Sequence, residues 1–419
     1  MSDKYSRFYR LLRQELVPAY GCTEPSALAY AAAYCVSVLG TFPDKAVVYL
    51  SGSVIKNIHS VGIPNAEMLK GPRAAAILGL IIGRPEDKLC ILKDVQIKDI
   101  ERAKELYYSD FCEIKLQNDY DGLYISVYIE KNNNTAEVTI EKEHTRVTSV
   151  KKNGNEIESH EIDHDTLVFK DNITLNDIIA FADNCKINEV SDVLELQIHD
   201  NTNIANEGLT GKYGVSIGKE ILDLYGYDDV RVRSKAMAAA ASEARMNGCV
   251  MPVVINSGSG NQGITASLPV IEFAKEYNVS HEKLLRSLCV ANLVAIMQKK
   301  TVGNLSAFCG AVHAAAGAAS GIAYLKGYSY KEISDTITYT LATIGGMICD
   351  GAKTSCAAKI SQAIDTALMG LQLSIQGRHF ESGDGLVKDS VEETIETYGI
   401  VGQKGMKTTN EVVLNLMLS

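Results

Sequence analysis

The chain has 419 residues, of which 46% are hydrophobic and 22% charged, and its formal net charge is −10 at pH 7. This length suits two domains that each bury a core, and the composition is that of a folded protein rather than a disordered one. The negative charge and the lack of a long basic run argue against nucleic acid or an anionic membrane as the main partner. Ten cysteines in a chain this long are too few for a disulfide-stapled secreted scaffold.

Two features of the sequence bear on where the protein resides. The first twenty residues carry charges at short intervals, which leaves no apolar segment for a signal peptide. The uncharged stretch 305–325 is long enough to span a bilayer, but alanine, glycine and serine dominate it. Such a stretch is typical of a helix packed on all sides by protein. We therefore expect a cytoplasmic protein without a membrane partner, whose cysteines are reduced.

Charge density divides the chain. Residues 85–170 hold 31 charged residues out of 86, whereas residues 250–370 hold 16 out of 121. The first segment is typical of a small domain with a wet surface, and the second of a helical core or a subunit interface. We predict an α+β protein with a mostly helical catalytic region, residues 1–84 and 196–419, and an inserted small α/β domain, residues 85–195. The low charge of the second segment also favours a homo-oligomer.

In the first half of the chain we expect a helix after Cys22, a strand, a second helix and an antiparallel β-meander. Apolar and polar residues alternate with period two in the meander, as in strands with one buried face. The dipeptide Asn153-Gly154 predicts a type I′ hairpin at its end. The segments are 26–39, 46–51, 97–108, 123–130, 135–143 and 145–151.

The second half is predicted to be helical, and capping residues mark several helix ends. Ser280 suits the N-cap of one helix, and Ser329 with Glu332 has the pattern of a capping box. Glycines follow several of these helical patterns, as helix C-termini prefer. The expected helices cover 230–247, 281–298, 329–345 and 354–369, and a last helix begins near Thr408.

A segment rich in glycine and amide side chains follows a short expected strand. Gly258, Gly260 and Gly263 have the G-x-G-x-x-G spacing of a dinucleotide-binding turn. That turn needs a helix at its third glycine, whereas Pro269 favours a helix that begins near Ser267, and no β-α-β pattern surrounds the segment. We therefore expect a loop whose backbone amides receive a small carboxylate. A tight turn between buried elements is the alternative.

Cys22 lies on a loop directly before the alanine-rich helix expected at 26–39. The dipole and the free amides of a helix N-terminus lower the pKa of a thiol, so the position favours a thiolate base or nucleophile. The alternative is a buried cysteine that acts as a small apolar side chain.

Four more cysteines lie in the apolar C-terminal half, namely Cys289, Cys309, Cys349 and Cys356. The last two flank a hydrophilic loop, and their C-x6-C spacing matches neither a zinc pair nor a ferredoxin motif. Spacing alone leaves open a metal site or separate buried thiols. The other five are expected to be core or incidental residues. These are Cys35, Cys90, Cys112, Cys185 and Cys249.

Several segments together carry a resemblance to a known family. They are 18–27 (PAYGCTEPSA), 70–75 (KGPRAA), 251–269 (MPVVINSGSGNQGITASLP) and the late cysteines. In these segments the chain resembles the L-cysteine desulfidase family (UPF0597), single-chain relatives of the α subunit of iron–sulfur L-serine dehydratase. The resemblance covers nearly the whole chain.

The resemblance implies an oxygen-sensitive enzyme with a [4Fe-4S] cluster that eliminates sulfide from L-cysteine, giving pyruvate and ammonia without pyridoxal phosphate. Cys309, Cys349 and Cys356 would hold three irons, the fourth iron would stay open to substrate, and Cys22 would be the proton acceptor. The glycine- and amide-rich loop would position the small amino-acid substrate. Its contributing residues would be Asn256, Ser257, Gly258, Asn261 and Gln262. Because Cys22 must meet the late cysteines, we expect the N-terminal helix to pack against the C-terminal region.

Two alternatives remain open. One is an iron–sulfur L-serine dehydratase/deaminase that acts on another β-substituted amino acid. The related serine dehydratases carry Ser-His-Thr shortly before Gly-Pro, where this chain has Glu67-Met-Leu-Lys70, and the difference favours the desulfidase. The other is a non-enzymatic iron–sulfur or thiol sensor. Lys70 and Arg73 are anion anchors on one interpretation and surface charges on the other.

Overall fold

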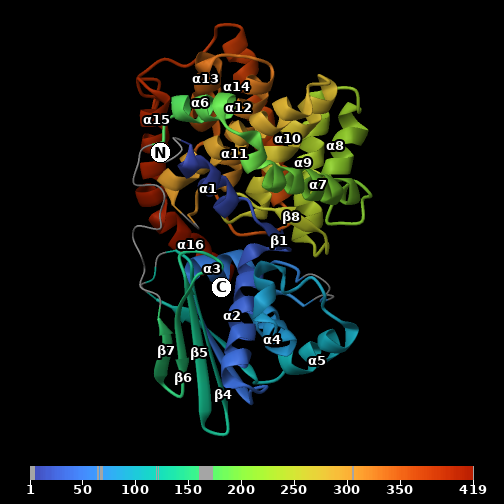
Figure 1. The fold of residues 1–419 in the computed structure, drawn as a ribbon, viewed down its shortest axis with the longest axis vertical. Coiled ribbons are helices and arrows are strands. Elements are labelled where there is room, and N and C mark those ends of the chain that lie inside the picture. The colour runs from blue at the N-terminus through green and yellow to red at the C-terminus, as the bar shows by residue number, and fades with distance from the viewer. Residues whose placement is uncertain are drawn as a thin grey trace.

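The computed structural model describes residues 5–63, 66, 69–118, 120, 122–159, 173–303 and 306–418. These residues form two parts, a smaller one built on a β-sheet and a larger one built from helices (Figure 1). The segregation of strands and helices confirms the predicted α+β class. None of the described helices combines the length and the apolarity that crossing a bilayer requires.

The smaller part contains a six-stranded sheet with the order β3-β2-β4-β5-β6-β7. β2 and β3 run parallel and every other neighbouring pair is antiparallel, so the predicted β-meander is confirmed. Its last turn is the predicted hairpin, because φ is positive at both Asn153 and Gly154. The strands span Lys45–Ser51 (β2), Cys112–Gln117 (β3), Tyr124–Lys131 (β4), Asn134–Glu141 (β5), Val147–Lys152 (β6) and Asn155–Ser159 (β7).

Two helices pack against one face of this sheet. α2 (Thr23–Leu39) contacts β4 and β5, and α4 (Gly71–Ile82) packs closely on α2. Gly79 of α4 permits this approach, because a Cβ atom there would lie 2.2 Å from the carbonyl oxygen of Ala29. The remaining helices of this part are α3 (Gly52–Ile58), η1 (Pro85–Cys90) and α5 (Ile97–Tyr107).

The predicted boundary at residue 84 falls inside the smaller part. β2 lies between β3 and β4, and α2 and α4 pack beside it, so residues on both sides of position 84 share one core. β2 is a central strand with mostly buried side chains. Because most of its side chains are buried, β2 has as few charged residues as the helical region, although it belongs to the sheet. Charge density in this chain separates wet surface from buried core rather than one part from the other.

In the larger part, helices surround α11 (His281–Val302) and α12 (Gly310–Leu325). Every residue of α12 from Ala311 to Leu325 is buried, which confirms the helix enclosed by protein that the uncharged stretch predicts. The other helices of this part are α1 (Ser6–Glu15), α6 (Leu175–Asn184), α7 (Ser191–Gly208), α8 (Ile217–Tyr225), α9 (Val230–Met246), α10 (Gly260–Glu276), α13 (Tyr330–Ile344), α14 (Cys356–Ile375) and α15 (Val391–Ile400).

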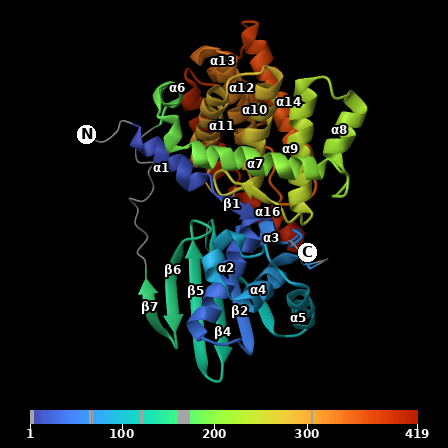
Figure 2. The same cartoon turned by 45° about the vertical axis from the view of Figure 1, so that its right-hand side comes forward.

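Segments from both ends of the chain join the two parts. β1 (Pro18–Tyr20) pairs antiparallel with β8 (Pro252–Val254), and α1 contacts α11. The C-terminal helix α16 (Lys407–Leu418) packs on α3 of the smaller part. Both views show β1, α3 and α16 where the two parts meet (Figure 2). β1 and α1 thus pack against the larger part, whereas α2, the helix expected to do so, packs chiefly on α4 and on the sheet of the smaller part.

The start of α10 corrects one expectation. The helix begins at Gly260 rather than near Ser267, and Pro269 lies in its interior. Ser259 caps it by accepting a hydrogen bond from the backbone N–H of Gln262. An early helix removes one argument against a dinucleotide turn, but the other stands, because β8 belongs to a two-stranded antiparallel sheet.

Candidate active site

Cys22 is the N-cap residue of α2 and lies at the junction of the two parts. Its side chain is 2% exposed and packs in a small cluster with Val61, Met246 and Cys356. Its Sγ atom donates a hydrogen bond to Oε2 of Glu24 at 3.0 Å. The expected lowering of its pKa is reversed, because burial and the negative charge of Glu24 raise the pKa of this thiol.

Glu24 is the centre of a buried polar network. Thr23 donates from Oγ1 to its Oε2 at 3.0 Å, and Asn57 donates from Nδ2 to its Oε1 at 2.9 Å. Nε2 of His144, from the loop after β5, lies 3.8 Å from Oε1. Burial alone would raise the pKa of Glu24, but His144 and the donors Cys22 and Asn57 outweigh burial and hold that pKa well below its usual range. The carboxylate is therefore ionised in the folded protein.

The three late cysteines lie on two adjoining loops. Cys309 precedes α12 and Cys349 lies between α13 and α14, where Phe308 and Ile348 form an isolated antiparallel bridge. The backbone N–H of Cys309 donates to the carbonyl of Met347 at 2.8 Å. The thiol of Cys309 is close enough to Cys349 to lower the pKa of that second thiol. Paired loops of this kind hold the two sulfur atoms side by side.

Cys356 connects the late cysteines to Cys22. It opens α14, interacts electrostatically with Cys349, and packs against the cluster that contains Cys22. One of the three late cysteines, Cys356, thus adjoins the cluster of Cys22, and the meeting of Cys22 with Cys309 and Cys349 stays a prediction. Cys289 lies elsewhere, because the group that raises the pKa of its thiol is Cys185 rather than a late cysteine.

Buried lysines surround these sulfur atoms. Lys56 donates from Nζ to the carbonyl of Cys349 at 3.2 Å and to Oδ1 of Asn410 at 2.6 Å. Burial lowers the pKa of Lys56 and of Lys299, while the charge of Cys349 acts on both in the opposite direction. Positive charge beside thiols favours their thiolate form, which is the form that binds metal.

The three late cysteines are the residues of this site that could hold a metal cluster. Among the residues that the structure describes, no three His, Cys, Asp or Glu side chains converge as ligands for one metal ion. An iron–sulfur cluster places each cysteine on a different iron, so its ligands stand further apart than those of one ion. Three interacting cysteines with lysines beside them fit this kind of group.

The glycine- and amide-rich loop forms a tight turn against the start of α2. Ser257 and Gly258 have φ values of 50° and 74°. Oγ1 of Thr23 donates to the carbonyl of Gly258 at 2.8 Å, which ties the turn to the residue after Cys22. Asn256 is buried and donates from Nδ2 to Oδ1 of Asn292 at 2.9 Å. The amide of Asn256, one of the predicted substrate-binding residues, is therefore bonded to a side chain inside the protein.

Asn261 and Gln262 occupy the first turn of α10. Oδ1 of Asn261 accepts a hydrogen bond from Nη1 of Arg245 at 3.1 Å. Oε1 of Gln262 is buried without a hydrogen-bond partner. A Cβ atom at Gly310 would lie 2.5 Å from Cδ of Gln262, so this amide lies directly beside the start of α12 and Cys309. The loop and the late cysteines therefore adjoin.

Several residues of this site were missed by the sequence analysis. Glu24, Asn57, His144 and Arg245 come from four separate elements, and only their burial together reveals them. The Thr-Glu pair after Cys22 was the one local signal, since an acid in the first turn of a helix is well placed to bind its neighbours.

Lys70 and Arg73, the two candidate anion anchors, lie outside this network. Lys70 is exposed, and Arg73 donates from Nη1 to the carbonyl of Tyr107 at 3.2 Å. Positions 67 and 68 of the segment that differs from the serine dehydratases lie outside the described residues.

Comparison with known proteins places the chain in a family. Residues 86–415 match the model of the serine dehydratase alpha chain. The chain belongs to the serine dehydratase alpha chain family. The matched range includes the loop of α10 and all three late cysteines, and it begins after Cys22.

Curated relatives of this chain align with it over almost their full length. A UPF0597 protein of Lachnoclostridium phytofermentans is 47% identical over 99% of this chain and 100% of its own. A UPF0597 protein of Treponema denticola is 42% identical over 99% of this chain and 98% of its own. The predicted relation to UPF0597 proteins and to the serine dehydratase alpha chain is thereby confirmed, while the relatives' names state no activity.

Proposed function

We propose that this chain is an L-cysteine desulfidase, which eliminates sulfide from L-cysteine and yields pyruvate, ammonia and hydrogen sulfide. The observation that carries the proposal is that Cys356 packs against the small cluster that contains Cys22, because this brings a candidate base near a candidate cluster ligand. Membership of a dehydratase subunit family supports β-elimination as the reaction class.

Cys309, Cys349 and Cys356 would hold a [4Fe-4S] cluster. Three cysteines leave one of its irons without a protein ligand. When bound, the cluster supplies a Lewis acid that stabilises the negative charge of elimination. Lys56 and Lys299 offset the negative charge of the three thiolates in this buried environment.

Cys22 would accept the proton from the Cα atom of the substrate. Its hydrogen bond to Glu24 fixes the direction of the sulfur atom, and Glu24 is the acceptor in reach of the thiol proton. Burial disfavours the thiolate, whereas the charge of Arg245 favours it. The ammonium group of a bound amino acid would add a second positive charge and shift the thiol further toward the thiolate.

The turn at 256–259 and the start of α10 would hold the substrate. The hydrogen bond between Thr23 and Gly258 keeps the turn at a fixed position relative to Cys22, as proton transfer requires. Oε1 of Gln262 is a buried acceptor without a partner, which suits the ammonium group of an amino acid.

L-Serine is the second candidate substrate, and the name of the matching family favours it. Both substrates lose a β-substituent after the same Cα proton is removed. They differ in the leaving group, which is a soft sulfide in one and a hard hydroxide in the other.

The test is anaerobic reconstitution with iron and sulfide, followed by a visible spectrum and pyruvate assays on L-cysteine and L-serine side by side. We expect a broad band at about 400 nm and faster release of pyruvate from L-cysteine. Cys309→Ala should lose the band, whereas Cys289→Ala, a buried cysteine outside the site, should keep it. Faster turnover of L-serine would reassign the substrate, and a band without turnover would favour the sensor.

A further inference from the structure

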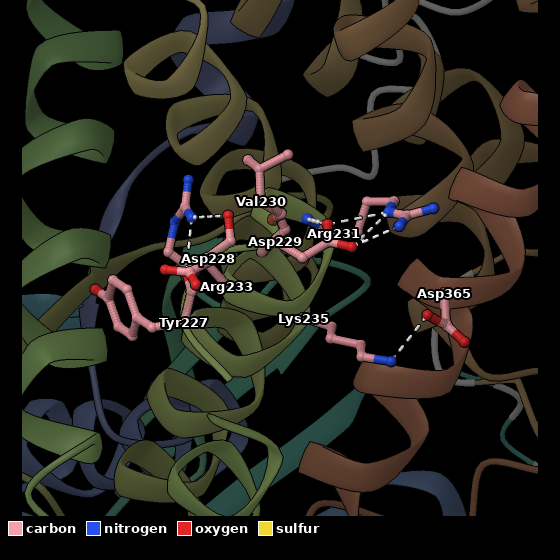
Figure 3. Close-up of polar contacts among 9 residues, drawn as sticks. Tyr227, Asp228, Asp229, Val230, Arg231, Arg233, Lys235 and Asp365 are labelled. Carbon is pink, nitrogen blue, oxygen red and sulfur yellow. Dashed lines mark hydrogen bonds and ion pairs between the residues drawn. The ribbon is translucent and has the colours of Figure 1, made fainter. Parts of the chain in front are cut away.

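α9 carries three arginines, and the two at its start are fully paired. Arg231 binds Asp229 with its Nε atom 3.0 Å from Oδ1. Arg233 donates from Nη1 to the carbonyls of Tyr227 and Asp228, and it also pairs with Glu276. Figure 3 shows how the residues around the helix start satisfy these two guanidinium groups. Nearby carboxylates and carbonyls therefore account for both charges.

Arg245, in the last turn of the same helix, is different. It is 2% exposed, and no carboxylate pairs with it among the described residues. Nη1 donates to the neutral amide of Asn261 at 3.1 Å, and Nε is buried with no acceptor. An unpaired buried charge costs several kcal/mol, which proteins normally avoid by pairing it. A negative group that binds beside it would remove this cost.

The surroundings of Arg245 define where such a group would bind. A Cβ atom at Gly260 would lie 2.3 Å from Nε of Arg245, so the guanidinium lies against the first residue of α10. The first turn of a helix offers backbone N–H groups without intrahelical acceptors, and these favour anions. The charge of Arg245 also acts on Cys22, and Met246 packs against that thiol. The cation therefore adjoins the candidate base.

Two further buried acceptors without a hydrogen-bond partner border the same region. They are Oε1 of Gln262 and Oδ1 of Asn57. A buried cation with a free donor, in a region that also holds buried acceptors without partners, is complementary in charge to a zwitterion. α-Amino acids have this pattern, with a carboxylate and an ammonium group on one carbon.

We propose that Arg245 binds the α-carboxylate of the substrate and makes the site specific for amino acids with a free carboxylate. This inference rests on the proposed function, since it assigns the anchor of the same site. It predicts that α-amino acid amides and esters are poor ligands even when their side chain fits.

The test uses calorimetric titration of the reconstituted full chain with L-alanine and with L-alaninamide. L-Alanine has no leaving group and is not consumed, and its amide lacks only the negative charge. We expect wild type to bind L-alanine at least about 100-fold more tightly than the amide, because charge-assisted hydrogen bonds to a buried guanidinium are strong. Arg245→Met should abolish this preference, and Arg245→Lys should reduce it about tenfold.

Arg233→Lys is the matched control, because it makes the same change in the same helix at an arginine that already has carboxylate partners. It should leave the preference for L-alanine intact. Equal wild-type affinity for both ligands, or an Arg245→Lys variant with the full preference, would overturn the assignment, and the wild-type comparison needs no variant to fold. If the wild type prefers L-alanine but releases no pyruvate from L-cysteine, the proposed desulfidase function is wrong, whereas carboxylate binding by Arg245 still holds.

Discussion

At the scale of single residues, the pair formed by Cys22 and Glu24 decides how the site behaves. A thiol at a helix start would ordinarily be acidic, but here burial and a neighbouring carboxylate raise the pKa of Cys22. The same contact lowers the pKa of Glu24. The free protein therefore holds the proton on sulfur, and the positive charges that gather at the site must favour its release.

Glu24→Gln tests the role of this carboxylate. The amide keeps the shape but removes the charge that orients the thiol and accepts its hydrogen bond, so kcat/KM for L-cysteine should fall about 100-fold or more. Pyruvate release by the reconstituted variant measures this. Glu137→Gln, on β5 and paired with Lys151, makes the same change away from the site and should retain wild-type rates. Equal losses in both variants would contradict a specific role for Glu24.

Glu15 makes the stability of the folded protein depend on pH, because its pKa is raised on folding. It is partly buried at the end of α1, and burial together with the charge of Glu143 raises its pKa from 4.5 to about 7 despite the favourable charge of His144. Between these values the folded state keeps a proton that the unfolded state releases, so stability falls as the pH rises from 4.5 to about 7.

Glu15→Gln removes this loss. Because Glu15 is partly exposed, we expect the variant to exceed wild type by about 1–2 kcal/mol at pH 8 and to differ little at pH 4. Denaturant unfolding at both pH values measures the difference. A gain of the same size at pH 4 and pH 8 would show that the carboxyl is not the cause.

At the scale of elements, close helix packing sets the position of the site. α2 carries Cys22 at its start, and its distance from α4 depends on Gly79, which has no side chain to separate the two backbones. Helix pairs that approach this closely tolerate no added atom, because the neighbouring backbone cannot move independently.

Gly79→Ala should therefore destabilise the protein by about 3 kcal/mol or more, since its Cβ atom would meet the carbonyl of Ala29. Gly405→Ala is the control, because a Cβ atom there has only an ordinary contact with Val401. Thermal unfolding of the two variants and of wild type compares them. A melting temperature for Gly79→Ala within two degrees or so of the control would contradict the close approach.

Signals that act between residues close in the sequence predicted many of the helices and turns of this chain correctly. Asn153-Gly154 and the pair Ser329–Glu332 act within four residues, and both form the predicted hairpin and capping box. Ser259 and Gln262 carry a similar capping pattern, but the proline at 269 outweighed it and misplaced the start of α10.

The candidate site was predictable only in part for the same reason. The late cysteines have no metal-binding spacing of their own, so only the family resemblance led us to expect that they meet Cys22. Arg245 belongs to no sequence motif. Whether a buried charge has a partner depends on residues that are distant in the sequence, so only the structure shows that Nε of Arg245 lacks one. The sheet membership of β2 likewise depends on strand pairing far along the chain.

At the scale of the whole molecule, the site lies where the two parts meet. The smaller part supplies Cys22, Glu24 and Lys56, and the larger part supplies the late cysteines. α16 helps to hold the parts together, because Asn410 accepts a hydrogen bond from Lys56 and donates to Oγ of Ser53 on α3.

Asn410→Ala should loosen this junction. It leaves the buried ammonium of Lys56 without one acceptor, which should lower stability by about 1–3 kcal/mol. Limited proteolysis should then cleave α16 faster than in wild type. Asn415→Ala, at an exposed position of the same helix, should leave the cleavage rate unchanged. Identical cleavage of both variants would argue against the contact.

The pairing of β1 with β8 has a consequence for how the protein is made. Cys22 leaves the ribosome early, whereas β8 and the late cysteines follow only after the sheet of the smaller part has been translated. That sheet is one continuous stretch of chain from β2 to β7 and can fold while synthesis continues. The thiol of Cys22 must wait for its partners, so the site closes, and any cluster is inserted, near the end of translation or after it.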